Sequence, residues 1–312
     1  MSARGRRWIV SWAAPVVFAL FCRVSPDFTA LLLDRVTRPG LMALHRLTAR
    51  VPFPVVEPLA FAAAVVALAA LAAALGRAVR RSEFAPLLGW LKGVGATALA
   101  LLWALALLWL PALLAPVEAP PMPDAGQLEW LCGALIEQLN REDLSFSDSA
   151  EVLRLAPEVA KLPGGAVKAA RYPEWMRRAG ISGLFVPITG EALVNADAPA
   201  PLVPFTAVHE LMHLSGVADE GAANIAAWER CVAASETFAN SARLWALRYA
   251  LGLLNRADPE AWRRVRGQMK GPLSRVFADC GGEACPRGRC ALLPGLARAC
   301  GDYADLAGWL AQ

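Results

Sequence analysis

The sequence predicts a mainly α-helical membrane protein, with three N-terminal transmembrane helices followed by a helical domain that has one short edge strand. Two observations predict the membrane part. Of the 312 residues, 56% are hydrophobic, with a mean hydropathy of +0.40, and the apolar surplus lies before residue 116. This composition exceeds that of a soluble domain, so part of the apolar surface is expected to face lipid. After residue 116, apolar residues recur at three- and four-residue spacing, which predicts helices.

The three transmembrane helices are expected at about residues 8–22, 55–76 and 94–115. The second and third are long enough for a span, which needs about 20 apolar residues. The first is short and has arginines on both sides, so a cleavable signal peptide is the alternative. Phe21 and Cys22 make a poor cleavage site and a poor acylation site, which favours an uncleaved helix.

Positive charges predict the orientation in the membrane. Residues 77–92, between the second and third helices, carry Arg77, Arg80, Arg81 and Lys92, whereas residues 117–140 carry no basic side chain. By the positive-inside rule, the 77–92 loop is cytoplasmic and everything after residue 116 lies outside. The basic start at residues 4–7 is then cytoplasmic too, as three spans require. Five arginines in the 23–54 segment argue against this orientation.

Charge and cysteine content narrow the function classes. The net charge of +4 and the lack of a long basic run give no sign of nucleic-acid binding. An even number of cysteines in a domain expected outside the cytoplasm predicts disulfides. A four-cysteine metal cluster at residues 280–300 is the alternative, although the spacing lacks the paired C-x2-C pattern. The six cysteines are Cys132, Cys231, Cys280, Cys285, Cys290 and Cys300.

Residues 116–126 are rich in proline and predict a stalk, which leaves residues 127–312 as one domain with a cysteine-rich tail. Helices are expected at residues 127–140 and 147–160. Residues 181–195 predict one or two short strands, and Pro187 is expected to confine them to a sheet edge.

Two further helices follow. The first is expected to start near Phe205 or Thr206 and to end at Gly216, because glycine tolerates the left-handed conformation after a helix terminus. Asp219 is a good N-cap for the next helix, which should reach Leu254 with a break near residues 235–241.

The chemistry is carried by His209-Glu210-Leu211-Met212-His213. Two histidines four residues apart share one helix face and can bind one metal ion. Glu210 is rotated by about 100° from His209 and can hold a water on the metal as a general base. The alternative is a chance pattern on a buried helix. His45, the third histidine, is expected to be a polar surface residue near the membrane.

Glu220 is the expected third metal ligand, because it falls in the first turn of the helix after Gly216. An ordinary first-turn acid that the helix dipole favours is the alternative. Asp219 is a rival ligand, but its N-cap role explains it without a metal. Asn224 shares the face of Glu220 and could hydrogen-bond a ligand histidine.

The pattern from His209 to Asn224, H-E-x-x-H-x-x-G-x-x-x-E-x-x-A-N, together with residues 183–195, resembles DUF3810, a family of bacterial membrane proteins described as zinc-metallopeptidase-like. A more distant likeness is to integral-membrane gluzincins of the CAAX-protease/HtpX type. The resemblance implies a zincin-like α+β metallopeptidase domain, Glu220 as the third zinc ligand, and an edge strand at residues 184–195 that aligns a peptide. The expected substrate-binding residues are Val186, Ile188, Gly190, Glu191 and Asn195.

The expected function is therefore a zinc (Zn2+) metallopeptidase anchored in the bacterial cytoplasmic membrane, with its catalytic domain outside the cytoplasm. Glu210 would take a proton from a zinc-activated water that attacks a peptide bond. A catalytically silent zinc-binding receptor or scaffold, and a zinc hydrolase of a non-peptide envelope substrate, are the alternatives. The expected partners are a peptide or protein substrate and membrane lipid. Four residues could stabilise the oxyanion: Arg243, Arg248, Tyr249 and Tyr303.

Overall fold

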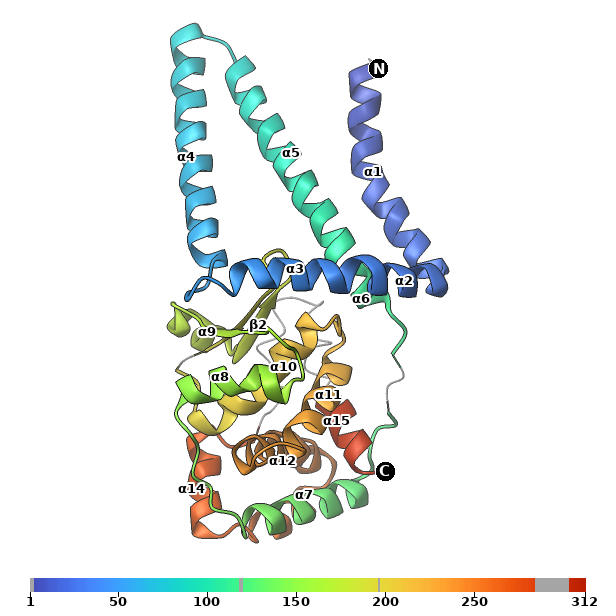
Figure 1. The fold of residues 1–312 in the computed structure, drawn as a ribbon, viewed down its shortest axis with the longest axis vertical. Helices are drawn as coiled ribbons and strands as arrows, with labels where there is room; N and C mark the ends of the chain where they lie inside the picture. The colour runs from blue at the N-terminus through green and yellow to red at the C-terminus, as the bar shows by residue number, and fades with distance from the viewer. Residues whose placement is uncertain (1–2, 118–119, 196, 284–302) are drawn as a thin grey trace. The chain divides into compact units, whose positions relative to one another are not determined.

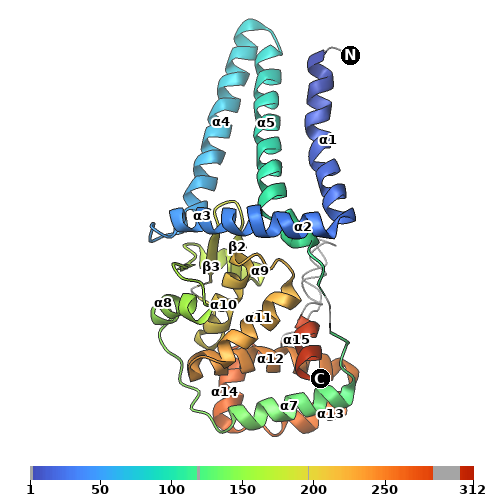
Figure 2. The ribbon, with the colours of Figure 1, turned by 45° about the vertical axis from the view of Figure 1, so that its right-hand side comes forward.

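The computed structural model describes residues 3–117, 120–195, 197–283 and 303–312 (Figures 1 and 2). The described chain is mainly helical and has three short strands, as the sequence predicts. It divides into two compact units. The first comprises residues 1–116 together with residues 186–191, and the second comprises residues 117–185 and 192–312.

The first unit contains the apolar helices. Helices α4 (Val56–Arg81) and α5 (Ala85–Leu108) are each long and apolar enough to cross a membrane. Helix α1 (Ala3–Val24) is followed by a helical segment that is bent from it by 113°, and this pair counts as a third candidate span only if it is taken as one. Among the described residues, two or three helices could therefore cross a membrane.

The boundaries of these helices differ from those predicted. Helix α4 continues past residue 76 to Arg81, because arginine and alanine are good helix formers. Helix α5 starts nine residues before residue 94 and ends at Leu108, after which a short helix α6 (Leu110–Leu114) carries Pro111 in its first turn. Proline is accepted there because the first turn has no internal partner for its backbone nitrogen.

A helical segment connects α1 to α4. It comprises α2 (Pro26–Leu32), a π-helical turn η1 (Leu33–Thr37) and α3 (Arg38–Thr48). The hydroxyl of Thr37 donates to the carbonyl of Leu107, 2.9 Å away. A Cβ at Gly40 would lie 2.8 Å from a methyl group of Leu108, so this glycine lets α3 pack closely on the end of α5.

The prediction that His45 is a surface residue was wrong. Its side chain on α3 is buried, and its Nδ1 lies 2.7 Å from the carbonyl oxygen of Gly190. The hydroxyl of Thr48 donates to the carbonyl of Thr189. The turn at residues 186–191 therefore packs on α3. His45 and Gly190 are 145 residues apart in the sequence, and local sequence patterns do not predict contacts between such distant residues.

Gly190 makes this close approach of two backbones feasible. Its φ is +65°, a conformation that favours glycine. A Cβ there would lie 2.8 Å from the backbone nitrogen of His45. The following residue, Glu191, is buried and accepts hydrogen bonds from the backbone nitrogens of Val55 and Val56, at 2.7 and 2.8 Å. Its carboxylate thus caps the start of α4.

The second unit is a helical domain arranged around α12 (Glu236–Ala257). This helix packs against α7 (Ala125–Leu139), α13 (Pro259–Arg266) and α15 (Tyr303–Leu310). The unit also contains α8 (Ser149–Val159), α9 (Pro173–Ala179) and α14 (Gly271–Asp279). The predicted helices at residues 127–140 and 147–160 correspond to α7 and α8. Asp124 and Gln127 form a capping box that starts α7, which places its first residue just before the predicted one.

The strands form one small sheet in the order β1 (Val167–Ala169), β3 (Glu191–Val194), β2 (Gly183–Val186). Strands β1 and β3 are parallel, and Lys168 lies opposite Leu193. The predicted edge strand at residues 184–195 is therefore two strands, of which β2 lies at the edge of the described sheet and β3 at its centre. Pro187 lies in the turn after β2, so it does not confine β3 to an edge as predicted.

The predicted disulfides are not seen among the described cysteines. Cys22, Cys132, Cys231 and Cys280 are free and buried. Burial raises the pKa of Cys132 to about 12 and that of Cys280 to about 11. Cys285, Cys290 and Cys300, and with them most of the alternative four-cysteine cluster, lie outside the described residues.

Candidate metal site

The two histidines lie on helix α10 (Val203–Leu214), every residue of which is buried. The helix follows a 3-10 turn, η2 (Ala200–Leu202), and starts just before the predicted Phe205. Helix α12 anchors this end, because the indole of Trp245 donates to the carbonyl of Leu202 and the hydroxyl of Ser241 accepts from the backbone nitrogen of Phe205, both at 3.0 Å. The anchor holds a buried helix terminus whose backbone groups need partners.

A tight turn returns the chain from α10 to α11 (Glu220–Val232). Gly216 has φ +92°, and the backbone nitrogen of Val217 donates to the carbonyl of Met212. This is the pairing that ends helices at a left-handed glycine, as predicted for Gly216. Asp219 caps α11 by accepting from the backbone nitrogen of Ala222, at 2.8 Å, so its N-cap role is confirmed. The turn brings the first residue of α11, Glu220, back to the histidines.

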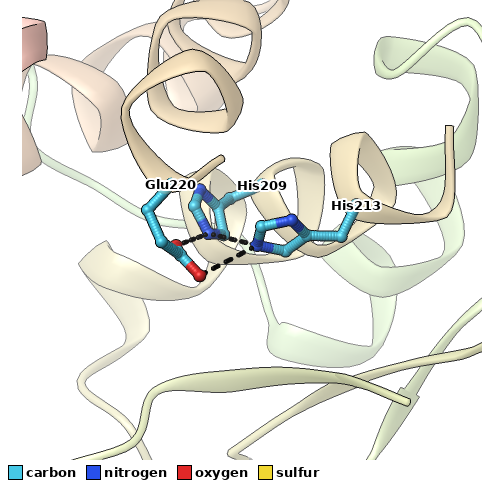
Figure 3. Close-up of side chains that lie close together, drawn as sticks. All are labelled: His209, His213 and Glu220. Carbon is cyan, nitrogen blue, oxygen red and sulfur yellow. Dashed lines mark hydrogen bonds and ion pairs between the residues drawn. The ribbon is translucent and has the colours of Figure 1, made fainter. Parts of the chain in front are cut away.

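His209, His213 and Glu220 form a compact triangle of ligand atoms (Figure 3). The Nε2 atoms of the two histidines are 3.1 Å apart. One oxygen of Glu220 is 3.1 Å from Nε2 of His209, and the other is 3.4 Å from Nε2 of His213. Ligand atoms about 2.0–2.1 Å from a tetrahedral ion are separated by roughly 3.3–3.4 Å. The three side chains could therefore hold one metal ion.

The backbone orients the imidazole of His213. Its Nδ1 lies 2.7 Å from the carbonyl oxygen of Val217, and a carbonyl can only accept, so Nδ1 carries the proton. In the neutral ring, Nε2 then has the lone pair, and Nε2 is the atom that faces Glu220 and His209. Metal-binding histidines are commonly oriented by such a bond from the other ring nitrogen. Phe185 stacks on the same imidazole, with ring centroids 6.4 Å apart.

Neighbouring charges and hydrogen bonds shift the pKa values of His213 and Glu220. Burial alone would lower the pKa of His213, but the hydrogen bond with Glu220 and the charges of Glu210 and Glu220 raise it to about 9. Burial alone would raise the pKa of Glu220, but hydrogen bonds from His209 and His213 hold it well below its ordinary value. The carboxylate of Glu220 therefore attracts both imidazoles and helps to keep the three side chains together.

Glu210 is buried beside this triangle. Burial raises the pKa of its carboxyl group, and the nearby His209 and His213 oppose that rise in part. A Cβ at Gly183, the first residue of β2, would collide with Oε1 of Glu210 and would lie 2.7 Å from a methyl group of Thr206. The carboxylate of Glu210 thus lies directly against the backbone of the edge strand.

A family model matches residues 39–279, which include the apolar helices α4 and α5 and the His–His–Glu triangle. The chain belongs to the DUF3810 family. The description of this family is "Protein of unknown function". No curated protein and no solved structure matches the chain. Membership in DUF3810 therefore confirms the family that the motif predicted and assigns no activity to it.

The other predicted site residues of this DUF3810 chain lie on α11 and on the segment from β2 to the residue after β3. Asn224 is fully buried on α11, and its amide has no hydrogen-bond partner among the described residues, so the predicted bond to a ligand histidine is not formed. Nδ1 of His209 is likewise buried without such a partner.

The five residues predicted to bind substrate are divided between strand ends and a turn. Val186 ends β2, Ile188 and Gly190 lie in the turn, and Glu191 caps α4. Asn195 follows β3, and its side chain accepts from the backbone nitrogen of Asp197 and donates to the carbonyl of Ile181. Glu191 and Asn195 are both buried, and these hydrogen bonds join their side chains to nearby backbone groups.

Two of the candidate oxyanion donors have partners of their own. Arg243 donates to the side chain of Asn240 at 2.8 Å, and Arg248 donates to the carbonyl of Gly282 at 2.8 Å and lies over the ring of Trp245. Tyr249 stacks on that same indole. The side chain of Tyr303 lies outside the described part of the chain.

The sequence reasoning missed three residues that shape the site: Gly183, Phe185 and Val217. A glycine inside a strand pattern is a signal of close backbone approach, so Gly183 could have been found. The roles of Phe185 and of the Val217 carbonyl depend on how the turn and the sheet fold back on α10, and no local pattern encodes that.

Proposed function

We propose that the chain is a membrane-anchored zinc metallopeptidase with a zincin-like domain, which hydrolyses peptide bonds outside the cytoplasm. The observation that carries the proposal is the triangle of His209, His213 and Glu220, with Glu210 beside it. Two imidazoles and one carboxylate are the ligand set of hydrolytic zinc sites, which leave a fourth position open. The ligand separations fit such an ion, and His213 already presents Nε2 to it.

When bound, zinc would supply a Lewis acid that polarises a carbonyl group and activates a water. Glu210 would act as the general base, since it is one residue from a ligand and its buried carboxyl group lies beside the triangle. The same carboxyl group can then give its proton to the leaving amine. Because Gly183 has no Cβ, the carboxylate of Glu210 can lie against β2, where it would be close to the backbone of a bound substrate.

The outer side of β2 is the proposed substrate-binding edge. An extended peptide can add to an exposed strand through backbone hydrogen bonds, a mode that needs few specific side chains. Strand β3 cannot serve, because β1 and β2 flank it on both sides in the described sheet. The proposed edge is therefore confined to residues 183–186, next to Glu210.

The test uses the full chain in detergent, with Glu210→Gln and a matched control, Glu229→Gln, at an exposed position on α11. We expect about one zinc per chain in all three proteins by mass spectrometry of the metal. Cleavage of a general peptide library should fall by roughly 10²–10⁴-fold in Glu210→Gln alone.

Three results would overturn parts of this proposal. Absence of zinc from the wild-type chain would remove the metal site. Equal cleavage by wild-type and Glu210→Gln proteins would remove Glu210 as the base. Zinc without cleavage of any peptide would favour a zinc-binding receptor or scaffold, or an enzyme that acts on a non-peptide envelope substrate.

A further inference from the structure

Helix α9 and the start of β2 display an unusual face, formed by Tyr172, Trp175, Ile181 and Leu184. The exposed fractions of these side chains are 63%, 80%, 38% and 45% in that order. Large apolar side chains gathered in one short segment at this exposure mark an interaction surface on a soluble domain. We call these four residues the aromatic face.

The geometry of α9 keeps the aromatic residues together. Tyr172 is the N-cap residue of α9, and the backbone nitrogen of Trp175, in the first turn, donates to its carbonyl at 3.1 Å. Met176, the residue after Trp175, is buried and anchors α9 to the domain. The indole of Trp175 therefore points to solvent because the helix is anchored by its other side.

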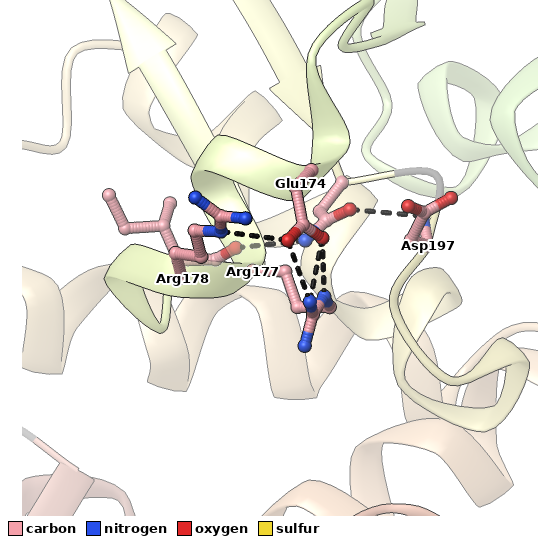
Figure 4. Close-up of polar contacts among 6 residues, drawn as sticks. Glu174, Arg177, Arg178 and Asp197 are labelled. Atoms are coloured by element: carbon pink, nitrogen blue, oxygen red, sulfur yellow. Dashed lines mark hydrogen bonds and ion pairs between the residues drawn. The ribbon is translucent and has the colours of Figure 1, made fainter.

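Positive charge accompanies the aromatic face. Glu174 binds Arg177 through two hydrogen bonds and Arg178 through one, all at 2.8 Å (Figure 4). Because a guanidinium has five N–H donors, both arginines keep donors for a further anion. Residues 171–184 contain three arginines and one acid, Glu174, so their net charge is +2.

We propose that the aromatic face lies in the headgroup layer of an anionic bilayer, with Arg177 and Arg178 contacting lipid phosphates. Tryptophan and tyrosine are enriched at membrane–water interfaces because one end of each ring system is apolar and the other is polar. Basic residues near a surface of acidic lipid are attracted to it and strengthen such a contact. The chain has two or three helices that could cross a membrane, and these would keep it at a lipid surface. This contact does not depend on zinc or on hydrolysis.

A second exposed tryptophan offers a matched control. Trp130 is 65% exposed on α7, in the same unit. Residues 125–139 carry Glu129 and Glu137 and no basic side chain, so their net charge is −2. Exposure alone would make the two indoles equivalent, whereas the proposed lipid contact separates them.

The experiment places the full chain in nanodiscs of phosphatidylglycerol with ordinary or brominated acyl chains, because bromine quenches indole fluorescence on contact. The chain has 11 tryptophans, so subtracting the spectra of Trp175→Phe and Trp130→Phe isolates each component. We expect brominated lipid to remove roughly half or more of the Trp175 component and little of the Trp130 component. The quenching of Trp175 should weaken in phosphatidylcholine and in an Arg177→Gln/Arg178→Gln variant. Unchanged melting temperatures would show that the variants remain folded.

Equal quenching of the two components, or none at Trp175, would overturn the proposal. Shielding of Trp175 only after a peptide is added would assign the face to a protein partner and would also overturn it. Quenching at Trp175 that ignores lipid charge would remove the role of the arginines. The metal and cleavage measurements are independent of all these outcomes.

Discussion

A single backbone carbonyl, that of Val217, sets the tautomer and the ring orientation of His213. The bond from Nδ1 leaves Nε2 toward Glu220, and the stacked ring of Phe185 limits rotation of the imidazole. His209 has no such bond at Nδ1 within the described chain, and its ring is positioned by contacts with Phe205 and His213. The two histidines therefore differ at Nδ1, where only His213 has a hydrogen bond, whereas the Nε2 atoms of both face Glu220.

Gly183→Ala should reduce hydrolysis while leaving zinc bound. The added methyl group would collide with Oε1 of Glu210, and a misplacement of about 1 Å can cost roughly 10²-fold in rate. Overpacking of this kind also costs about 1–3 kcal/mol of stability. Turnover, KM, zinc content and melting temperature would be measured together.

Gly133→Ala is the matched control for that substitution, since a Cβ at this α7 position meets nothing within 4 Å. It should keep full activity and gain about 0.5–1 kcal/mol, because alanine is the better residue inside a helix. If Gly183→Ala retains wild-type turnover with zinc bound, the close contact with Glu210 has no catalytic importance.

The residues of the triangle could be predicted because their spacing is local. The i, i+4 histidines need only a helix, and Glu220 needs only a turn at Gly216 and a cap at Asp219, all within a dozen residues. The contact between Gly183 and Glu210, and that between His45 and Gly190, join segments far apart in the chain. Periodicity and capping rules carry no information about such pairs, which is why His45 was placed wrongly.

At the scale of elements, the hairpin of β2 and β3 serves two purposes. Its edge strand starts against Glu210, while its turn provides Glu191 and Gly190 to α4 and α3. The sequence predicts strands here, but it also predicts that the whole segment, residues 184–195, aligns a peptide substrate. Hydrophobic alternation locates a strand, but it does not say which strand becomes the centre of a sheet, and parallel pairing with β1 decides that here.

Glu191→Gln should destabilise the first unit. Its carboxylate accepts from the backbone nitrogens of both Val55 and Val56, and an amide would turn a donor toward one of them. Loss of a charge-assisted bond and an unmatched donor in a buried place cost about 1–3 kcal/mol. The melting temperature of the full chain in detergent should therefore fall.

Glu83→Gln, an exposed change just beyond the other end of α4, is the control and should leave the melting temperature unchanged. Equal melting temperatures for the Glu191→Gln and wild-type proteins would show that the capping bonds contribute nothing to stability.

At the scale of the whole molecule, charges at the ends of helices predict the orientation in the membrane. Arg77, Arg80 and Arg81 occupy the last part of α4, and Lys92 lies in the first part of α5. These residues surround the short α4–α5 connection, and short basic loops stay in the cytoplasm. The second unit follows α5 and α6, so this rule assigns it to the outside.

Alkaline phosphatase fusions would test this orientation, because that reporter folds only outside the cytoplasm, where its disulfides form. A fusion after Gln312 should be active, and a fusion after Ser82, in the α4–α5 connection, should be inactive. The opposite pair of results would place the His–His–Glu triangle in the cytoplasm, and it would agree with the lack of a disulfide among the described cysteines. Activity at both sites would mean that α5 does not cross the membrane, because α5 separates the α4–α5 connection from the second unit.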